Sequence, residues 1–201
     1  MKKFITFEGG EGAGKTTLID SIEKALVKQG FHVLKVREPG GTKLGEAVRN
    51  LLLHAENPVA PVAELCLFLA SRAQHLAEVI EPALKAGKIV LCDRFNDSSV
   101  AYQGLGRGLG MDKVQQMCDL VCHGLQPELT FYLDIDPAVG LARAHKARAQ
   151  DRIESETLSF HQKIREAYHR IHKLHPHRLY LIDASQPPEQ VFAQAMACLL
   201  K

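Results

Sequence analysis

The sequence predicts a doubly wound α/β fold, in which a five-stranded parallel sheet carries helices on both faces. Three observations support this prediction. Five short apolar runs alternate with longer segments of helical periodicity. A glycine-rich stretch separates the first run from the first helical segment, and the third run ends in an acid, Asp93. Ligands of such folds bind beyond the carboxyl ends of the strands, so we expect the site at that edge.

The first half of the chain is expected to form two strands and three helices. In chain order these are a strand at 3–8, a helix at 15–29, a strand at 31–37, and helices at 44–53 and 59–85. Leu18, Ile22 and Leu26 lie on one face of the first helix, and Gly30 is suited to end it. Pro82 predicts a disturbance near the end of the long third helix, because proline removes a backbone donor.

The second half continues the alternation. The expected elements are strands at 88–93, 129–134 and 178–182, and helices at 112–123, 155–174 and 188–200, with a further helix opening at Pro137. Proline suits that first helical position. A basic stretch at 143–152 interrupts this helix. No internal repeat or low-complexity linker divides the 201 residues, so we predict one domain covering 1–201.

Composition and charge exclude several classes of protein. Lys plus Arg number 25 and Asp plus Glu 23, which is too small an excess for a general nucleic-acid or membrane-surface binder. Five cysteines are an odd number, which favours reduced thiols and a cytosolic protein. The apolar start is too short for a signal peptide, and the most apolar helical stretch, 59–70, contains Glu64 and falls short of a membrane span. We therefore expect a cytoplasmic protein that contacts neither nucleic acid nor membrane.

Residues 9–16, Gly-Gly-Glu-Gly-Ala-Gly-Lys-Thr, match the phosphate-loop pattern G-x-x-x-x-G-K-[ST] between a predicted strand and a predicted helix. Glycines let backbone N–H groups turn inward around an anion, and the helix start adds its positive end. We expect Lys15 to reach the β- and γ-phosphates of a nucleoside triphosphate and the Thr16 hydroxyl to ligate Mg²⁺. The motif does not identify the phosphoryl acceptor.

A second motif follows the third predicted strand, where Asp93 and Arg94 begin a run of small polar, aromatic and amide side chains. An acid beside a phosphate loop can hold Mg²⁺ through water, and an arginine can grip a phosphate with two donors. The run that continues to Gln103 contains the kinds of side chain that line a nucleoside pocket.

Three segments carry a resemblance to the thymidylate kinase family, bacterial type. They are Leu91–Gln103 (LCDRFNDSSVAYQ), Arg37–Gly41 (REPGG) and Leu67–Arg72 (LFLASR), which stand at the family's spacings from the phosphate loop. The similarity extends from Phe4 to residues 183–187. The resemblance implies a P-loop nucleoside monophosphate kinase fold, transfer of the ATP γ-phosphoryl group to dTMP, Mg²⁺ and a homodimer.

The resemblance also implies roles for individual residues. Phe68 stacks on thymine, Arg72 and Gln103 hydrogen-bond it, and Ser99 lines the base site. Arg94 holds the acceptor phosphate, with Arg37 or Arg49 as a neighbour, while Tyr102 crowds the sugar C2′ and Glu11 lies near the 3′-hydroxyl. Tyr168 lies near the substrate. The full ATP-binding set is Gly9, Gly10, Glu11, Gly12, Ala13, Gly14, Lys15, Thr16 and Thr17; Glu38 belongs to the substrate set, and Thr16 and Asp93 to the metal.

A basic lid is expected at about 143–153, where Arg143, His145, Lys146, Arg148 and Arg152 face a single acid, Asp151. One branch of the family places a catalytic arginine within the phosphate loop, whereas the bacterial branch supplies it from the lid. Ala13 follows Gly12 here, so this chain follows the second arrangement. Arg143 and Arg152 match basic positions of the family lid and are our catalytic candidates, together with Lys15, Asp93 and Arg94. The choice between the two lid arginines stays open.

Two alternatives remain at this point. One is a kinase for another nucleoside monophosphate, or a deoxynucleoside kinase in which Glu38 acts as base for a hydroxyl acceptor. The other is a P-loop switch that controls a partner, although the guanine-specifying Asn-Lys-x-Asp motif is absent. An acceptor-dependent rate distinguishes an enzyme from a switch.

Overall fold

A parallel sheet lies at the centre of the computed structural model, which describes residues 2–54, 58–145 and 151–199. In this part of the chain, five strands pair in the order β2-β3-β1-β4-β5. Their bounds are β1 (Phe4–Gly9), β2 (Val33–Arg37), β3 (Ile89–Asp93), β4 (Leu129–Asp134) and β5 (Leu179–Asp183). The predicted fold class is confirmed.

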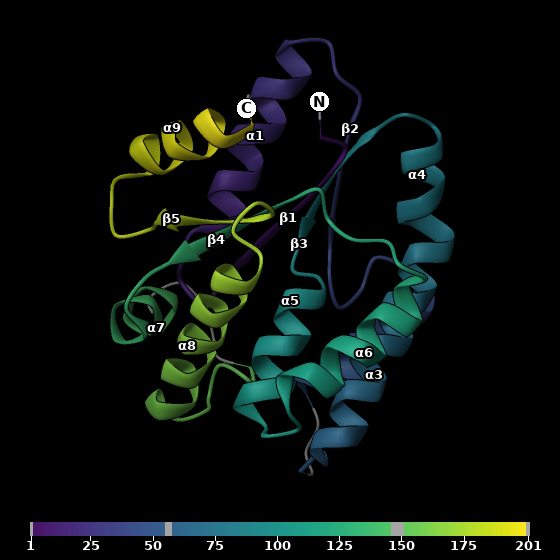
Figure 1. Ribbon diagram of the computed structural model, residues 1–201, viewed down its shortest axis with the longest axis vertical. Coiled ribbons are helices and arrows are strands. Elements are labelled where there is room, and N and C mark those ends of the chain that lie inside the picture. Colours follow the sequence, from purple (N-terminus) through teal and green to yellow (C-terminus); the bar gives the residue numbers. More distant parts are fainter. Residues whose placement is uncertain (1, 55–57, 146–150, 200–201) are drawn as a thin grey trace.

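Helices cover both faces of the sheet. They are α1 (Lys15–Lys28), α2 (Lys43–Leu53), α3 (Pro61–His75), η1 (Leu76–Ile80), α4 (Glu81–Lys85), α5 (Asn96–Ser99), η2 (Val100–Gly106), α6 (Met111–Cys122), α7 (Pro137–His145), α8 (Leu158–Leu174) and α9 (Pro188–Leu199). Figure 1 shows α1 and α9 on one side of the sheet and α5, α6 and α8 on the other. No helix in the described ranges is long and apolar enough to cross a membrane.

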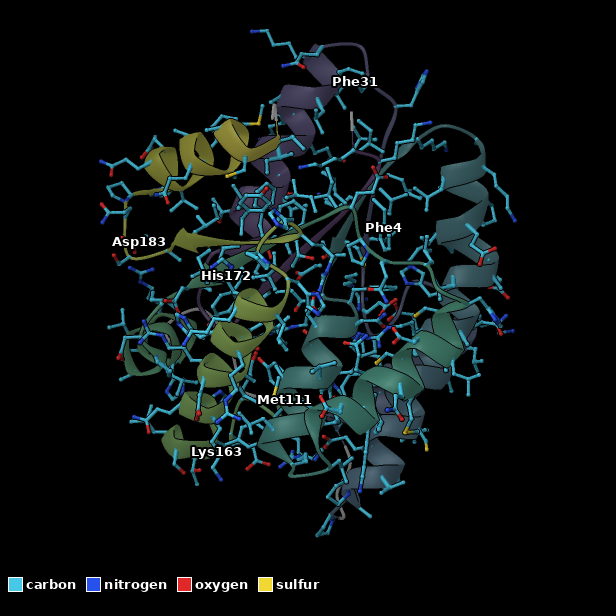
Figure 2. All side chains as sticks on the ribbon, in the orientation of Figure 1. Phe4, Phe31, Met111, Lys163, His172 and Asp183 are labelled. Atoms are coloured by element: carbon cyan, nitrogen blue, oxygen red, sulfur yellow. The ribbon has the colours of Figure 1, made fainter. Side chains whose placement is uncertain are left out.

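Alternating side chains of each strand supply two different cores. On β1, Ile5 and Phe7 pack with α1 and α9, whereas Phe4 packs on the opposite face with η1 and Phe95. Successive strand residues point to opposite faces, so a strand covered on both sides needs apolar residues throughout. Figure 2 shows Phe4 inside the molecule and Lys163 on the outer side of α8.

Two helices differ from the prediction. The helix expected at 59–85 is three consecutive elements, because the N–H of Glu81 bonds the carbonyl of Leu76, five residues back, just before Pro82. The helix expected from 155 begins at Leu158, where the Thr157 hydroxyl accepts from the N–H of Phe160. In addition, residues 96–106 are helical, an element that the sequence patterns did not identify.

The register of the sheet brings the two predicted motifs together. Asp93 at the end of β3 is level with Phe7 of β1 and with Arg37 of β2. The phosphate loop leaves β1 two residues later. Both motifs therefore begin at the same edge of the sheet, as the fold class requires.

Candidate functional site

The phosphate loop turns tightly from β1 into α1. Gly12 has a φ of 66° and Gly14 a φ of 90°, conformations that side chains with a Cβ rarely adopt. A Cβ at Gly12 would also lie 2.1 Å from the carbonyl oxygen of Gly140, so only glycine lets α7 pack against the loop. Helix α1 starts at Lys15 without a side-chain cap, which leaves its first N–H groups for an anion.

Lys15 folds back over the loop. Its Nζ atom donates to the carbonyl oxygens of Gly9 and Gly10, each at 3.1 Å. Burial, and then the positive charge of Arg94, lower the pKa of Lys15. A phosphate oxygen would be a stronger acceptor than either carbonyl, so the ammonium group is placed to exchange them for a phosphate.

One cavity of about 630 Å³ gathers most of the predicted residues. Gly9, Gly10, Arg152 and Tyr168 are the predicted site residues that do not line it. The two glycines hold Lys15, as described above. The predicted residues that line it are Glu11, Gly12, Ala13, Gly14, Lys15, Thr16, Thr17, Arg37, Glu38, Arg49, Phe68, Arg72, Asp93, Arg94, Ser99, Tyr102, Gln103 and Arg143.

Arg94 enters this cavity from a turn with a φ of 70°, a rare conformation for a residue other than glycine. Its NH2 atom donates to Glu11 at 2.7 Å and its NH1 atom to the Ser98 hydroxyl at 3.3 Å. The guanidinium carbon lies 5.1 Å from the centre of the Tyr102 ring. Contacts on three sides therefore fix the direction of this cation.

Glu8, which sequence reasoning missed, lies buried beneath Arg94. Its carboxylate accepts from the N–H of Phe95 at 2.8 Å, from Ser98 at 2.5 Å and from the Tyr168 hydroxyl at 2.7 Å. Burial, and then the charge of Asp97, raise the pKa of Glu8 to about 7 despite these donors. The only signal in the sequence is an acid near the end of a mostly apolar strand.

Arg72 is buried at one side of the cavity beside Phe68. Its Nε atom donates to Glu38 at 2.6 Å, NH1 to Ser99 at 3.0 Å and to the Cys118 sulfur at 3.7 Å, and NH2 to the carbonyl of Phe95 at 3.0 Å. Four of its five N–H groups thus have acceptors in the described structure. One N–H of NH2 remains for a ligand.

Glu38 is the buried partner of Arg72. Its other carboxylate oxygen lies 3.2 Å from Nδ1 of His75. Arg49 donates to the carbonyl of Pro39 at 2.9 Å, and Arg37 donates to the same carbonyl at 3.1 Å. Glu38 therefore orients the guanidinium of Arg72. This role argues against Glu38 as the general base of a kinase that phosphorylates a hydroxyl group.

The two lid arginines point in different directions. NH1 of Arg143 donates to the carbonyl of Ala184 at 3.1 Å, and this side chain lines the main cavity. Arg152 donates instead to Glu64 at 2.6 Å and to the carbonyl of Leu52 at 3.0 Å. Lys146 and Arg148 lie outside the described residues.

Glu154, just beyond the predicted lid segment, is a second residue that sequence reasoning missed. It is 3% exposed and lines the main cavity. Burial, reinforced by the carboxyl of Glu11, raises its pKa to about 7. Glu154 thus brings a second acid close to Glu11 of the phosphate loop.

A second hollow of about 360 Å³ adjoins the phosphate loop on the side of α1. Gly14, Thr17 and Arg143 line it together with residues 184–188 from the loop after β5. This loop was not among the predicted site residues, although it marked the end of the family resemblance.

The donor atoms at the phosphate loop suit Mg²⁺. Asp93 Oδ1 is buried without a hydrogen-bond partner in the described structure, and Asp93 and Thr16 both line the main cavity. No cluster of three or more His, Cys, Asp or Glu side chains within 2–54, 58–145 and 151–199 could hold a metal alone. Mg²⁺ usually takes one or two protein oxygens and completes its shell with water and substrate phosphates, which this arrangement matches.

Comparisons with known proteins agree on one family. The family model for thymidylate kinase matches residues 7–195. Thymidylate kinase of Protochlamydia amoebophila is 51% identical over 205 aligned positions, covering 98% of this chain and 91% of the relative. That of Geobacillus thermodenitrificans is 48% identical, with coverages of 98% and 89%. The crystal structure of thymidylate kinase from Ehrlichia chaffeensis superposes with a TM-score of 0.81 at 35% identity, covering 98% of both chains.

Proposed function

This chain belongs to the thymidylate kinase family, and on that premise we propose that it transfers the γ-phosphoryl group of ATP to dTMP, giving dTDP and ADP. One observation carries the proposal most directly. A single cavity is lined both by the phosphate loop and by Phe68, Arg72 and Gln103, with Arg94 also on its wall. That arrangement suits two nucleotides that meet through their phosphates.

The acceptor needs no strong general base. The second pKa of a phosphate monoester is about 6, so the attacking oxygen is largely deprotonated at neutral pH. The task is to align two anions and neutralise the charge that develops between them. Lys15 binds the transferred phosphate, Arg94 holds the acceptor phosphate, and Arg143 approaches from the lid side. All three line the same cavity.

Mg²⁺ is part of the proposal. Thr16 and Asp93 would hold it, Asp93 partly through water, because their oxygens lie beside the phosphate loop. When bound, the ion would withdraw negative charge from the phosphate oxygens of ATP. The adenosine of ATP would occupy the second hollow, between Arg143 and the loop after β5.

The surroundings of the site complete the proposal. We assign the whole chain to one cytoplasmic kinase domain whose lid comprises about residues 143–153. A homodimer is supported by the exposed apolar side chains of Leu51 on α2 and Val62 on α3, which are 60% and 58% exposed on adjacent helices.

The decisive experiment is a coupled assay of ADP release with ATP and Mg²⁺. We expect rapid release with dTMP and only a slow background without it. Thymidine in place of dTMP tests for a hydroxyl-directed kinase, and dUMP and dCMP test the base. ATP binding without dTMP-dependent ADP release would refute the proposal and favour a nucleotide switch.

A further inference from the structure

We propose that Glu64 sets the base specificity of the acceptor pocket by fixing the side-chain amide of Gln103 with its carbonyl oxygen toward the base. This inference rests on the proposed dTMP kinase activity. Glu64 does not line the cavity, so its role is that of a positioning residue that acts through Gln103.

Both side chains are buried, Glu64 at 1% and Gln103 at 2% exposed. Nε2 of Gln103 donates to Oε1 of Glu64 at 2.9 Å. An ionised carboxylate only accepts hydrogen bonds, so a flipped amide would set two oxygens against each other in a buried site. The carboxylate therefore selects one of the two amide orientations.

Glu64 is held in its ionised form and in its place. Arg107 donates to both of its oxygens, at 3.1 and 3.2 Å, and Arg152 donates to Oε2 at 2.6 Å. Burial acts to raise the pKa of Glu64, but the hydrogen bonds from Arg107, Gln103 and Arg152 outweigh it and hold that pKa below its ordinary value. Donors on both oxygens leave the carboxylate no freedom to turn away from the amide.

The pocket consequently presents one acceptor and one donor. Gln103 lines the cavity, and one N–H of its Nε2 donates to Glu64, which turns the amide so that Oε1 is its acceptor for the base. Arg72 lines the same cavity and retains one N–H, as argued above. The two side chains are linked through Ser99, which accepts from Arg72 and stands four residues before Gln103 on a continuous helical run.

This pattern matches a pyrimidine with an N3–H donor beside an O4 acceptor, as in thymine and uracil. Cytosine reverses both groups, since its N3 accepts and its 4-amino group donates. A pocket built for one hydrogen-bonding pattern can reject the other by large factors, on the order of 10⁴, because buried polar groups are then left unpaired. Glu64 determines which pattern Gln103 presents.

The test compares dTMP with 5-methyl-dCMP, which keeps the methyl group and changes only the hydrogen bonds at N3 and C4. In Glu64→Gln, the new amide can donate as well as accept, so Gln103 can turn. We expect the ratio of kcat/KM for dTMP to that for 5-methyl-dCMP to fall at least tenfold. Glu64→Asp keeps an acceptor-only group and should preserve the ratio even if both rates fall.

Glu156→Gln is the matched control. Glu156 is the other carboxylate partner of Arg107, so this variant removes one negative charge from the same cluster without touching Gln103. We expect its substrate ratio to equal that of the wild type. A folded Glu64→Gln enzyme with the wild-type ratio, or the same fall in Glu156→Gln, would overturn the inference.

If Glu64→Gln does not fold, the variants Gln103→Leu and Glu64→Asp together test the inference. The leucine variant removes the acceptor that opposes cytosine N3, so its ratio must fall, while that of Glu64→Asp must hold. Any other result contradicts the inference. Wild-type enzyme that does not phosphorylate dTMP at all would instead refute the proposed function, which keeps the two failures separate.

Discussion

Replacing Tyr168 by phenylalanine tests the buried network beneath Arg94. The Tyr168 side chain is fully buried, and its hydroxyl is one of three donors to the carboxylate of Glu8, at 2.7 Å. A hydrogen bond to a charged group contributes about 1.5–3 kcal/mol. For a chain of this size each kcal/mol corresponds to about 2–4 °C in Tm. We therefore expect Tyr168→Phe to lower Tm by roughly 3–12 °C.

Tyr132→Phe is the matched control, because the two rings stack with their centres 4.4 Å apart. The Tyr132 hydroxyl donates to Asp134 at a longer distance, 3.3 Å, and Arg165 already donates to both oxygens of that carboxylate. Loss of this hydroxyl should cost less than about 1 kcal/mol. Both variants remove a single oxygen from adjacent rings, so the difference between them reports on Glu8.

The pH dependence sharpens the test. Burial raises the pKa of Glu8 to about 7, above its ordinary value of 4.5. The folded state therefore binds the Glu8 proton more tightly than the unfolded state does. The stabilisation that this proton contributes is complete below pH 4.5 and is lost as pH rises through about 7. At pH 8 Tyr168 donates to a carboxylate, and at pH 5 to a neutral acid that is a weaker acceptor.

Calorimetry of both variants at pH 5 and pH 8 measures these effects. We expect the loss in Tyr168→Phe to exceed that in Tyr132→Phe, and to be larger at pH 8 than at pH 5. Equal losses in the two variants, or a larger loss at pH 5, would refute the reasoning.

Three further outcomes are expected. Arg94→Ala should lower dTMP-dependent turnover on the order of 10³-fold while ATP titration gives a nearly unchanged Kd; unchanged turnover would exclude the assigned role. Chelation of Mg²⁺ should abolish activity, and Asp93→Asn should raise the Mg²⁺ concentration needed for half-maximal rate by about 10–100-fold; an unshifted titration would remove Asp93 from the metal site. Arg143→Ala should lower kcat by about 10³-fold or more, as expected for an arginine that stabilises the transferring phosphoryl group. Arg152→Ala should instead mainly lower Tm, because Arg152 donates to the buried carboxylate of Glu64. A large loss of kcat in Arg152→Ala with little loss in Arg143→Ala would make Arg152 the catalytic arginine.

The fold and the phosphate loop could be predicted because their signals are local. Lys15 and the glycines before it stand in one short segment, and each strand is a short run rich in apolar residues. Asp93 was predicted to meet the loop for a topological reason, since the ends of parallel strands share an edge. Such predictions need only the spacing within an element and a rule for how elements join.

The residues that support the site could not be predicted in this way. Tyr168 and Glu8 are 160 residues apart, and Gln103 and Glu64 are 39 apart, so no periodicity connects either pair. The resemblance placed Tyr168 near the substrate but did not indicate that its hydroxyl donates to the buried carboxylate of Glu8. A buried acid becomes interpretable only when its donors are known, because burial and partners act on it in opposite directions.

The cationic side chains of the cavity differ in what accepts their hydrogen bonds: some donate to backbone carbonyls and others to carboxylates. Lys15 and Arg143 donate to backbone carbonyls, which are dipoles, so a phosphate can replace those contacts without separating an ion pair. Arg94 pairs with Glu11, whose carboxylate must release or share the guanidinium when a phosphate arrives. The family resemblance places Glu11 near the sugar 3′-hydroxyl, a donor that its carboxylate would then accept in exchange for the guanidinium. If Arg94 and Glu11 have the proposed roles, binding of the acceptor phosphate and recognition of the deoxyribose are coupled through this one ion pair, which gives an acid a use inside a loop that binds anions.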